Sequence, residues 1–197
     1  MRHPLDSALL YRAWQWPFVA QKVARFRRRA ALEPSTRVLD IGCGPGTNAG
    51  LFAGTRHIGL DRDAGYVRSA AGRGMRVMVG DAAALPLAAG AGFDCVFVNS
   101  LLHHLTDAQV ESMLARVVQV MHPDGRLHVI DLVVPPRGIG RRLALADRGE
   151  HPRTLSALRT LLARHVALEH EEPFRLTLAG VPLWAMIYFC GSPRHPA

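Results

Sequence analysis

Two aspartates around a glycine-rich turn are the residues of this sequence best suited to bind a ligand. Residues 38–46 read VLDIGCGPG, so Asp40 lies near the end of an apolar run and three glycines follow it. Glycine lets the backbone turn sharply and approach a ligand closely. Asp61 lies about 20 residues beyond the turn, where nucleotide-binding α/β folds place an acid that accepts hydrogen bonds from ribose hydroxyls. This pattern predicts a site for an adenosine-containing ligand.

The position of Asp40 indicates which adenosine ligand the turn would take. A pyrophosphate would meet like-charge repulsion from this carboxylate, whereas a cation would be attracted to it. The dinucleotide fingerprint G-x-G-x-x-G or A also fails at its last position, which is Thr47. S-adenosylmethionine carries adenosine, a sulfonium and an ammonium group, and no phosphate. The residues therefore favour S-adenosylmethionine over a nicotinamide dinucleotide.

Motifs along nearly the whole chain resemble those of class I S-adenosylmethionine-dependent methyltransferases. The resemblance is to small-molecule members, of the methyltransferase type 11 or ubiquinone/menaquinone methyltransferase kind. It rests on residues 38–46, 58–63 (IGLDRD), 79–87 (VGDAAALPL), 93–105 (FDCVFVNSLLHHL) and 122–135 (HPDGRLHVIDLVVP). These motifs imply methyl transfer from S-adenosylmethionine, with S-adenosylhomocysteine as product. They are specific to the superfamily and leave O-, N- and C-methylation open.

The resemblance implies a cofactor-binding role for a set of residues in these motifs. Those in the glycine turn would surround the methionine part, the acid after the second strand would hold the ribose, and the later ones would contact adenine and sulfonium. An aromatic N-terminal lid would add cation–π contacts. In chain order the set is Tyr11, Trp14, Asp40, Gly42, Cys43, Gly44, Asp61, Arg62, Asp81, Ala82, Asn99 and Ser100.

Methyl transfer itself asks little of the protein beyond alignment of the acceptor and exclusion of water. A general base matters only if the attacking O–H or N–H must lose a proton. His103 and His104 follow the expected fourth strand at its carboxyl end, where open α/β sheets bind ligands, and are the candidate bases. The candidate acceptor-binding residues are Asp131, Arg141, Trp184 and Tyr188. No ligand spacing predicts a metal site.

The elements that must position these residues alternate between strand and helix patterns. Strands are expected at residues 37–41, 57–61, 76–81, 93–99 and 127–134, then at 166–168 or 174–178, and at 183–190. Helices are expected at 6–31, interrupted at Pro17, and at 47–53, 64–72, 106–121, 140–147 and 155–163. Thr106 and Gln109 form a capping box.

This order predicts an α/β fold, a doubly wound Rossmann-like sheet of seven strands with helices on both faces. The sheet should be mostly parallel with an antiparallel last strand, because the last two strands have no helix between them. The chain reads as one domain, with N-terminal lid helices at residues 1–36 and an S-adenosylmethionine-binding methyltransferase domain at 37–197.

Composition limits the partners and the compartment. The formal net charge is +8, but Lys22 is the single lysine among many arginines, which is typical of a coding bias. The fourth-strand motif lacks the proline pair and aromatic residue of amino-methylating nucleic acid enzymes, so we expect a small-molecule acceptor and no nucleic acid. The longest apolar run is about half a membrane span, so we expect no membrane partner, and no secretory signal is evident. Three scattered cysteines indicate reduced thiols and a cytoplasmic protein.

Three alternatives stay open. A domain could bind S-adenosylmethionine without catalysis, as a sensor or assembly partner. An NAD(P)-dependent oxidoreductase would need NADH binding, against which Asp40 and Thr47 argue. The N-terminal aromatic residues would also suit the surface of a homodimer. Charged residues around Arg141 would favour an anionic acceptor if they faced the pocket.

Overall fold

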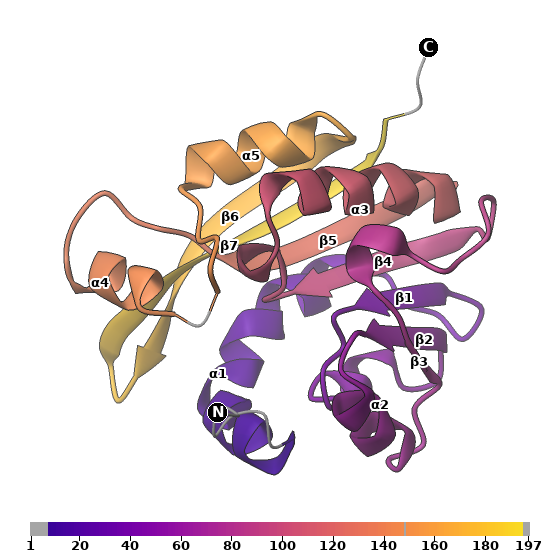
Figure 1. Cartoon of the computed structure of the whole chain (residues 1–197), viewed down its shortest axis with the longest axis horizontal. Helices are drawn as coiled ribbons and strands as arrows, with labels where there is room; N and C mark the ends of the chain where they lie inside the picture. Colours follow the sequence, from indigo (N-terminus) through magenta and orange to yellow (C-terminus); the bar gives the residue numbers. More distant parts are fainter. Residues whose placement is uncertain (1–7, 148, 195–197) are drawn as a thin grey trace.

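The computed structural model describes residues 8–147 and 149–194, and it has the predicted seven-stranded sheet. The strands are β1 (Arg37–Ile41), β2 (Arg56–Asp61), β3 (Val77–Val79), β4 (Phe93–Asn99), β5 (Met121–Leu132), β6 (Val166–Leu178) and β7 (Val181–Pro193). Their order across the sheet is β3-β2-β1-β4-β5-β7-β6 (Figure 1). β7 runs antiparallel to both its neighbours, and the other pairings are parallel. The antiparallel strand is therefore the last one, as predicted.

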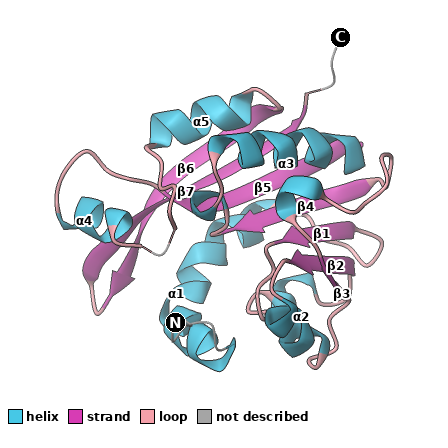
Figure 2. Cartoon of the chain, viewed as in Figure 1, coloured by secondary structure: helices cyan, strands magenta, loops and turns pink. Residues whose placement is uncertain are grey.

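Helices cover both faces of the sheet (Figure 2). They are α1 (Ala8–Arg29), α2 (Ala64–Ala71), α3 (Asp107–Val120), α4 (Ile139–Leu145) and α5 (Leu155–Ala163). Short 3₁₀ turns form η2 (Ala49–Phe52), η3 (Ala82–Ala84) and η4 (Leu102–His104). No described helix combines the length and the apolar character needed to cross a membrane.

Alternate residues of the central strands fill two hydrophobic cores, one on each face. Val96 and Val98 of β4 pack with α3 and α5, whereas Cys95 and Phe97 pack with α1 and η2. Both sets are almost fully buried, which is the pattern of a strand covered on two sides. The continuous apolar run at residues 95–98 in the sequence has this physical origin.

The N-terminal helix differs from the prediction, because Pro17 does not interrupt it. Proline removes one backbone donor and crowds the preceding turn. Here packing offsets the cost, since Phe18 and Phe26 of α1 are buried in the hydrophobic core on this face of the sheet. Gln21 also pairs with Thr177 of β6 in both directions, with N···O distances of 2.8 and 2.9 Å. α1 is thus one helix held on the body of the fold.

Two other predicted elements also differ in extent. Residues 166–168 and 174–178 are the ends of one strand, β6, whose pairing with β7 shifts register near Leu168 and Leu176. Those shifts break the period-two pattern and hid the middle of the strand in the sequence. The helix expected at 47–53 is only the 3₁₀ turn η2. The predicted capping box of α3, from Thr106 and Gln109, is present.

Candidate active site

The glycine turn after β1 takes a conformation that explains its composition. Gly42, Gly44 and Gly46 have φ values of 73°, 55° and 77°, which side-chain-bearing residues rarely adopt. A Cβ at Gly46 would also overlap the sulfur of Met75. The amides of Gly42 and Cys43 both donate to the carbonyl of Leu60, so the turn is fixed to the end of β2.

Asp61 at the end of β2 is held rigidly beside this turn. Its Oδ2 accepts from the Gly44 amide at 2.8 Å and its Oδ1 from the Asp63 amide at 2.9 Å. Burial raises the pKa of this carboxyl, while the two amides act in the opposite direction. Each oxygen keeps a further lone pair. The geometry therefore suits acceptance of hydrogen bonds from a ligand's hydroxyl groups.

Asp40 lies beneath the turn, only 1% exposed. Among the described residues its Oδ2 has no hydrogen-bond partner, and the nearest cationic candidate, His57 Nε2, is 3.9 Å away. Burial, followed by the charge of Asp61, raises the pKa of Asp40 to about 8. A buried carboxylate without a donor is costly unless it is protonated or faces a cation. This orphaned acid fits a cationic ligand above the turn.

A groove of about 300 Å³ runs along the carboxyl ends of β1, β2 and β4. It brings together predicted residues from four separate motifs: Gly42, Gly44, Asp61, Arg62, Asp81, Ala82 and Ser100. Asp81 has a second task there, since its Oδ1 accepts from the Ala83 amide at 2.9 Å and caps η3. Cys43 and Asn99 line a smaller adjoining cavity. The side chains of Tyr11 and Trp14 lie outside the described residues.

Ser100 stands where the cavities meet. It lines the groove, the adjoining cavity beside Asn99, and a third cavity on the far side of the strand end. Its φ of 55° places a non-glycine residue in the left-handed region, a conformation that costs about 1–3 kcal/mol and clusters at functional sites. The Ser100 amide donates to the carbonyl of Ile130 at 2.8 Å, which ties this strained turn to β5.

Lys22 of α1 is the residue that sequence reasoning missed. Its side chain is buried, and Nζ donates to Gln15 Oε1 at 2.8 Å and to Ser100 Oγ at 2.9 Å. Burial lowers the pKa of Lys22 to about 8, although Asp131 and Asp147 act to raise it. Its being the single lysine of an arginine-rich chain was the one available signal.

The third cavity, of about 70 Å³, lies between α1, η4 and β7, and we call it the acceptor cavity. Its apolar walls are Phe18, Leu132, Leu176, Trp184 and Met186, and its polar lining is Gln15, Lys22, Ser100, His103, His104 and Asp147. Trp184 packs edge-on against Phe18, with ring centroids 5.4 Å apart. His104 belongs to this cavity and to the groove alike. The two spaces therefore share Ser100 and His104.

His103 is clamped between two carboxylates. Its Nδ1 bonds to Asp131 Oδ1, and its Nε2 lies 3.3 Å from Asp147 Oδ1. Burial alone would lower the pKa of His103, but the two acids outweigh it and raise the pKa to about 9. Near neutral pH the ring is consequently an imidazolium. An imidazolium whose two nitrogens both pair with carboxylates is poorly suited to act as a general base.

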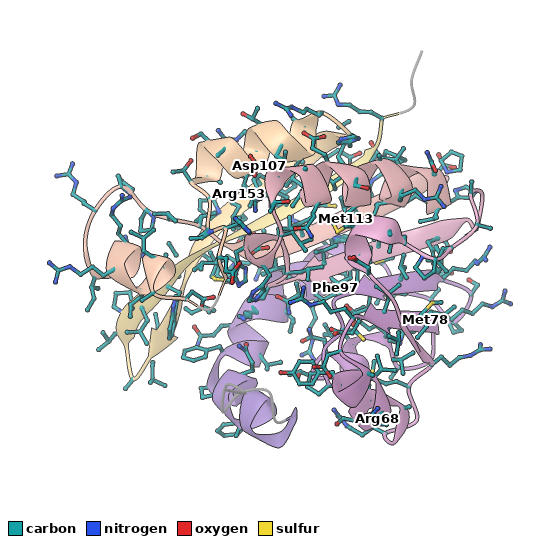
Figure 3. The ribbon with its side chains drawn as sticks, viewed as in Figure 1. Arg68, Met78, Phe97, Asp107, Met113 and Arg153 are labelled. Carbon is teal, nitrogen blue, oxygen red and sulfur yellow. The ribbon has the colours of Figure 1, made fainter. Side chains whose placement is uncertain are left out.

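Arg153 fixes the turn that carries both histidines (Figure 3). It donates to the carbonyl oxygens of Leu102 and Leu105 at 2.7 and 2.6 Å, and to Asp107 Oδ1 at 2.7 Å. Figure 3 labels Arg153 and Asp107 close together at the start of α3. The η4 turn is thus pinned at both ends by one guanidinium.

Three of the predicted acceptor residues are not in the walls of the acceptor cavity. Asp131 is buried under η4, where Oδ2 accepts from the Leu102 amide and Oδ1 from the Leu132 amide, both at 2.6 Å. Tyr188 is fully buried in the core, with its hydroxyl 2.8 Å from His128 Nδ1. Arg141 is exposed on α4. Trp184 is the one that lines the cavity.

One group of donors in the described part of the chain is compact enough to surround an ion. The donor atoms of His103, His104 and Asp147 all lie within 4.8 Å of one another. The hydrogen bonds of His103 to its two carboxylates account for this proximity without a metal. The absence of a metal ion from this site stays a prediction.

A family model for the methyltransferase domain matches residues 38–125 of this chain. That segment runs from β1, through the glycine turn, Asp61 and η4, to Gly125 in the first half of β5. It includes the residues that line the groove.

Curated relatives include enzymes with different acceptors. The demethylmenaquinone methyltransferase of Mycolicibacterium vanbaalenii is 32% identical over 118 residues, which cover 56% of this chain and 50% of that protein. The tRNA (carboxymethyluridine(34)-5-O)-methyltransferase of Arabidopsis thaliana is 32% identical over 112 residues, covering 56% and 26%. This chain thus spans half or less of the length of these relatives.

Solved structures share the whole fold at low sequence identity. The phosphoethanolamine N-methyltransferase 2 of Haemonchus contortus, solved with S-adenosyl-L-methionine, superposes with a TM-score of 0.77 at 15% identity, covering 98% of this chain and 59% of that one. The fold, the acid-flanked glycine turn and the matching family model agree with one another. Residues 38–125 therefore carry a methyltransferase domain, and the chain as a whole has the fold of class I S-adenosylmethionine-dependent methyltransferases.

Proposed function

We propose that this protein transfers a methyl group from S-adenosylmethionine to a small-molecule acceptor held in the acceptor cavity. The observation that carries the proposal is the junction at Ser100 and His104, which line both the groove and the acceptor cavity. A donor methyl directed through this junction would meet a nucleophile on the other side. In-line displacement requires such an arrangement, with donor and acceptor in separate but adjoining spaces.

The cofactor would occupy the groove and the small cavity beside it. Asp61 would accept hydrogen bonds from the ribose hydroxyls, with Arg62 beside it, and Asp81 with Ala82 would contact the adenine end. When bound, S-adenosylmethionine supplies a methyl group on a positively charged sulfur. The carboxyl group of Asp40 fits that positive charge, because its Oδ2 has no hydrogen-bond partner among the described residues. We further propose that residues 1–36 act as the lid over this site.

The walls of the acceptor cavity support a small acceptor with an apolar body. They combine five apolar side chains with six polar ones, and of the polar residues His104 also lines the groove and Lys22 the small cavity beside it. The acceptor's lone pair would form the new bond to the methyl carbon while the carbon–sulfur electron pair returns to sulfur. If the acceptor must lose a proton, Lys22 or His104 would take it, whereas His103 would position the turn.

Two features support the remaining expectations. The cysteines Cys43, Cys95 and Cys190 are free and buried, which agrees with a cytoplasmic protein. The acceptor cavity is small and shares its walls with α1, which favours a compact acceptor over a nucleic acid. Because the Arabidopsis relative is named as a tRNA methyltransferase, tRNA belongs in any test of the acceptor.

Calorimetric titration with S-adenosylmethionine, S-adenosylhomocysteine and NADH tests the first half of the proposal. We expect the wild type to bind the first two and the Asp61→Ala variant to lose at least tenfold in affinity, since hydrogen bonds to a charged group contribute about 1.5–3 kcal/mol. Asp124→Ala is the matched control, because that side chain is 93% exposed and far from the groove. Binding of NADH alone would make the protein an oxidoreductase instead.

Transfer of label from methyl-labelled cofactor tests the second half. Small phenols, amines, quinols and bulk tRNA serve as acceptors, and the labelled product is identified by mass. Labelling of a small compound, reduced in the Asp61→Ala variant, supports the proposal. Labelling of tRNA alone would replace the small-molecule acceptor. Cofactor binding with no transfer to any acceptor would favour the non-catalytic alternative.

A further inference from the structure

Large apolar side chains are exposed at one end of the molecule. Of six such residues in the described part of the chain, five lie on α1, on α4 and at the turn between β6 and β7. We call these five the rim: Trp16 is 79% exposed, Ile139 62%, Leu145 55%, Val181 54% and Leu178 48%. The sixth, Val79, is 54% exposed on β3, at the opposite edge of the sheet.

The three elements that carry the rim are neighbours. α4 packs on β7, where a Cβ at Gly140 would lie 3.2 Å from the carbonyl oxygen of Leu183. α1 packs on β6 through the paired Gln21 and Thr177. In Figure 1, α4 and the β6–β7 turn form the left end of the molecule, α1 lies beside them at the lower centre, and β3 lies at the right. The rim residues thus belong to one end of the fold.

The same end is strongly basic. α1 has no acidic residue along its 22 residues. Residues 135–146, which include α4, contain three arginines and no acid, and residues 173–184 around the β6–β7 turn contain one arginine and no acid. The four arginines of these two segments, Arg137, Arg141, Arg142 and Arg175, are all exposed. Exposed apolar groups and unopposed cations therefore occur together.

The rim also borders the acceptor cavity. Phe18 of α1, Leu176 of β6 and Trp184 of β7 line that cavity, and each lies within eight residues of a rim residue on the same or an adjoining element. Asp147, which follows α4, lines it as well. A surface that contacts the rim would therefore lie next to the place where we propose that the acceptor binds.

Three kinds of partner could cover such a surface, and charge and side-chain type distinguish them. A second copy related by a twofold axis would bring two basic surfaces together, which is unfavourable. RNA would suit the arginines, but it is bound by aromatic stacking, and four of the five rim residues are aliphatic. An anionic lipid surface suits both, because apolar side chains enter the acyl boundary while arginines pair with lipid phosphates.

We propose that the rim docks this protein on the surface of an anionic lipid bilayer. The sequence-based expectation of no membrane partner rested on the lack of a spanning segment, and peripheral docking needs none. A further consequence, which rests on the proposed function, is that the acceptor is an amphiphile drawn from that surface. Its apolar part would lie against Trp184 and Met186 in the acceptor cavity.

Vesicle flotation tests the docking directly. The full chain is mixed with vesicles of phosphatidylcholine alone, or of phosphatidylcholine with phosphatidylglycerol, without any cofactor. The apolar variant is Ile139→Ser/Leu178→Ser/Val181→Ser, and the charge variant is Arg141→Glu/Arg142→Glu. The matched controls are Val79→Ser and Arg56→Glu/Arg68→Glu, which change the same residue types on β2, β3 and α2. Figure 3 labels Arg68 on α2, distant from α4.

We expect at least tenfold more wild-type protein to float with the anionic vesicles than with phosphatidylcholine alone. The apolar and charge variants should lose this binding, and the amount of each control that floats should stay within twofold of wild type. Each variant must bind S-adenosylmethionine as the wild type does, which shows that it is folded. Equal flotation of wild type with both vesicles, or no flotation, overturns docking. Docking is also overturned if vesicle binding is lost in the charge variant but kept in the apolar variant. A gel shift in which the wild type binds tRNA and the charge variant does not would then assign the arginines to RNA binding.

Sedimentation velocity tests whether a second copy of this chain binds the rim instead. A wild-type dimer that becomes a monomer in the apolar variant would assign the rim to a second copy and overturn docking. The fate of the proposed function is read separately. If the protein binds vesicles but methylates no acceptor, docking stands and the proposed catalytic function fails. If the protein methylates a water-soluble acceptor but does not float with vesicles, the catalytic function stands and docking fails.

Discussion

Lys22 Nζ donates a hydrogen bond to Ser100 Oγ across 2.9 Å, and this contact joins the N-terminal helix to the turn after β4. The lysine belongs to α1 and the serine to the carboxyl edge of the sheet, 78 positions later in the chain. Together they line the acceptor cavity and the small cavity beside the glycine turn. The packing of α1 on the sheet therefore builds the junction between the acceptor cavity and the small cavity beside the glycine turn.

Replacing Lys22 tests whether it takes a proton from the acceptor. The Lys22→Arg variant keeps a cation but cannot act as a base near neutral pH. Because the pKa of Lys22 is about 8, we expect the wild-type rate to rise with pH and level off above that value. The variant should lose about 10²–10⁴ in kcat and lose this rising limb. A wild-type pH profile retained by the variant would contradict the role, and KM distinguishes lost binding from lost chemistry.

Asp40 predicts that cofactor binding depends on pH. Its pKa of about 8 in the free protein means that the acid is mostly protonated at neutral pH. A cationic cofactor favours the ionised form, so binding should release a proton, and affinity should rise with pH and become constant above about 8. Calorimetry in buffers of different ionisation enthalpy measures that proton. In Asp40→Asn the release should vanish and affinity should fall about tenfold, equivalent to roughly 1.4 kcal/mol.

His103 predicts a pH dependence of stability. Its pKa is raised from 6.5 to about 9 in the folded state, so its contribution is complete below about pH 6.5 and is lost as pH rises through about 9. The contribution is a few kcal/mol, at roughly 1.4 kcal/mol for each pKa unit. We expect the free energy of unfolding of the wild type to fall across this window. In the His103→Gln variant the free energy of unfolding should not fall across this window. The variant should also be less stable than the wild type at every pH below about 9, because Asp131 loses its cationic partner.

Gly149 should be intolerant of any side chain. A Cβ there would overlap the ring of His103 and approach its carbonyl oxygen to 2.5 Å. We expect Gly149→Ala to lower the free energy of unfolding by about 1–3 kcal/mol and to displace the imidazole from Asp147. Gly50→Ala is the control, because no atom lies within 4 Å of its would-be Cβ. Equal melting temperatures for the two variants would show that the loop at Gly149 adjusts freely.

Metal removal should leave the reaction unchanged. Both ring nitrogens of His103 already pair with the carboxylates of Asp131 and Asp147. In the protonated ring each nitrogen carries a proton, so neither has a lone pair free to bind a metal ion. Dialysis against EDTA should not alter the methyl-transfer rate, and added Zn²⁺ or Mn²⁺ should not raise it. A rate that falls with chelation and returns with one of these ions would assign His103, His104 and Asp147 to a metal centre.

The clustering of the groove residues could be predicted from the sequence because its signals are local. The glycines of the turn are required by backbone conformation, and Asp61 follows its strand directly, so both are visible as short motifs. Strands buried on both faces also leave continuous apolar runs, which is why β1 and β4 were predicted with the correct bounds. Local chemistry and the parallel sheet then place these residues at one edge.

The acceptor side could not be predicted in the same way, because tertiary contacts define it. Lys22 acquires its position from the packing of a helix whose interior proline suggested a break. Asp131 and Tyr188 occur at strand positions that looked suitable for binding an acceptor. In the structure Asp131 accepts a hydrogen bond from the Leu102 amide at the start of η4, and the Tyr188 hydroxyl pairs with His128. A one-dimensional pattern does not record which face of the sheet or which loop a polar side chain will meet.

The place of β7 in the sheet has a consequence for the order of assembly. β7 is the last strand along the chain, but it lies between β5 and β6 and not at an edge. During synthesis β6 therefore has no neighbouring strand to pair with until β7 emerges. Because Trp184 and Met186 come from β7, the acceptor cavity is the last part of the molecule to be completed. A ribosome-bound chain could assemble the groove for the methyl donor well before it offers any place for a methyl acceptor.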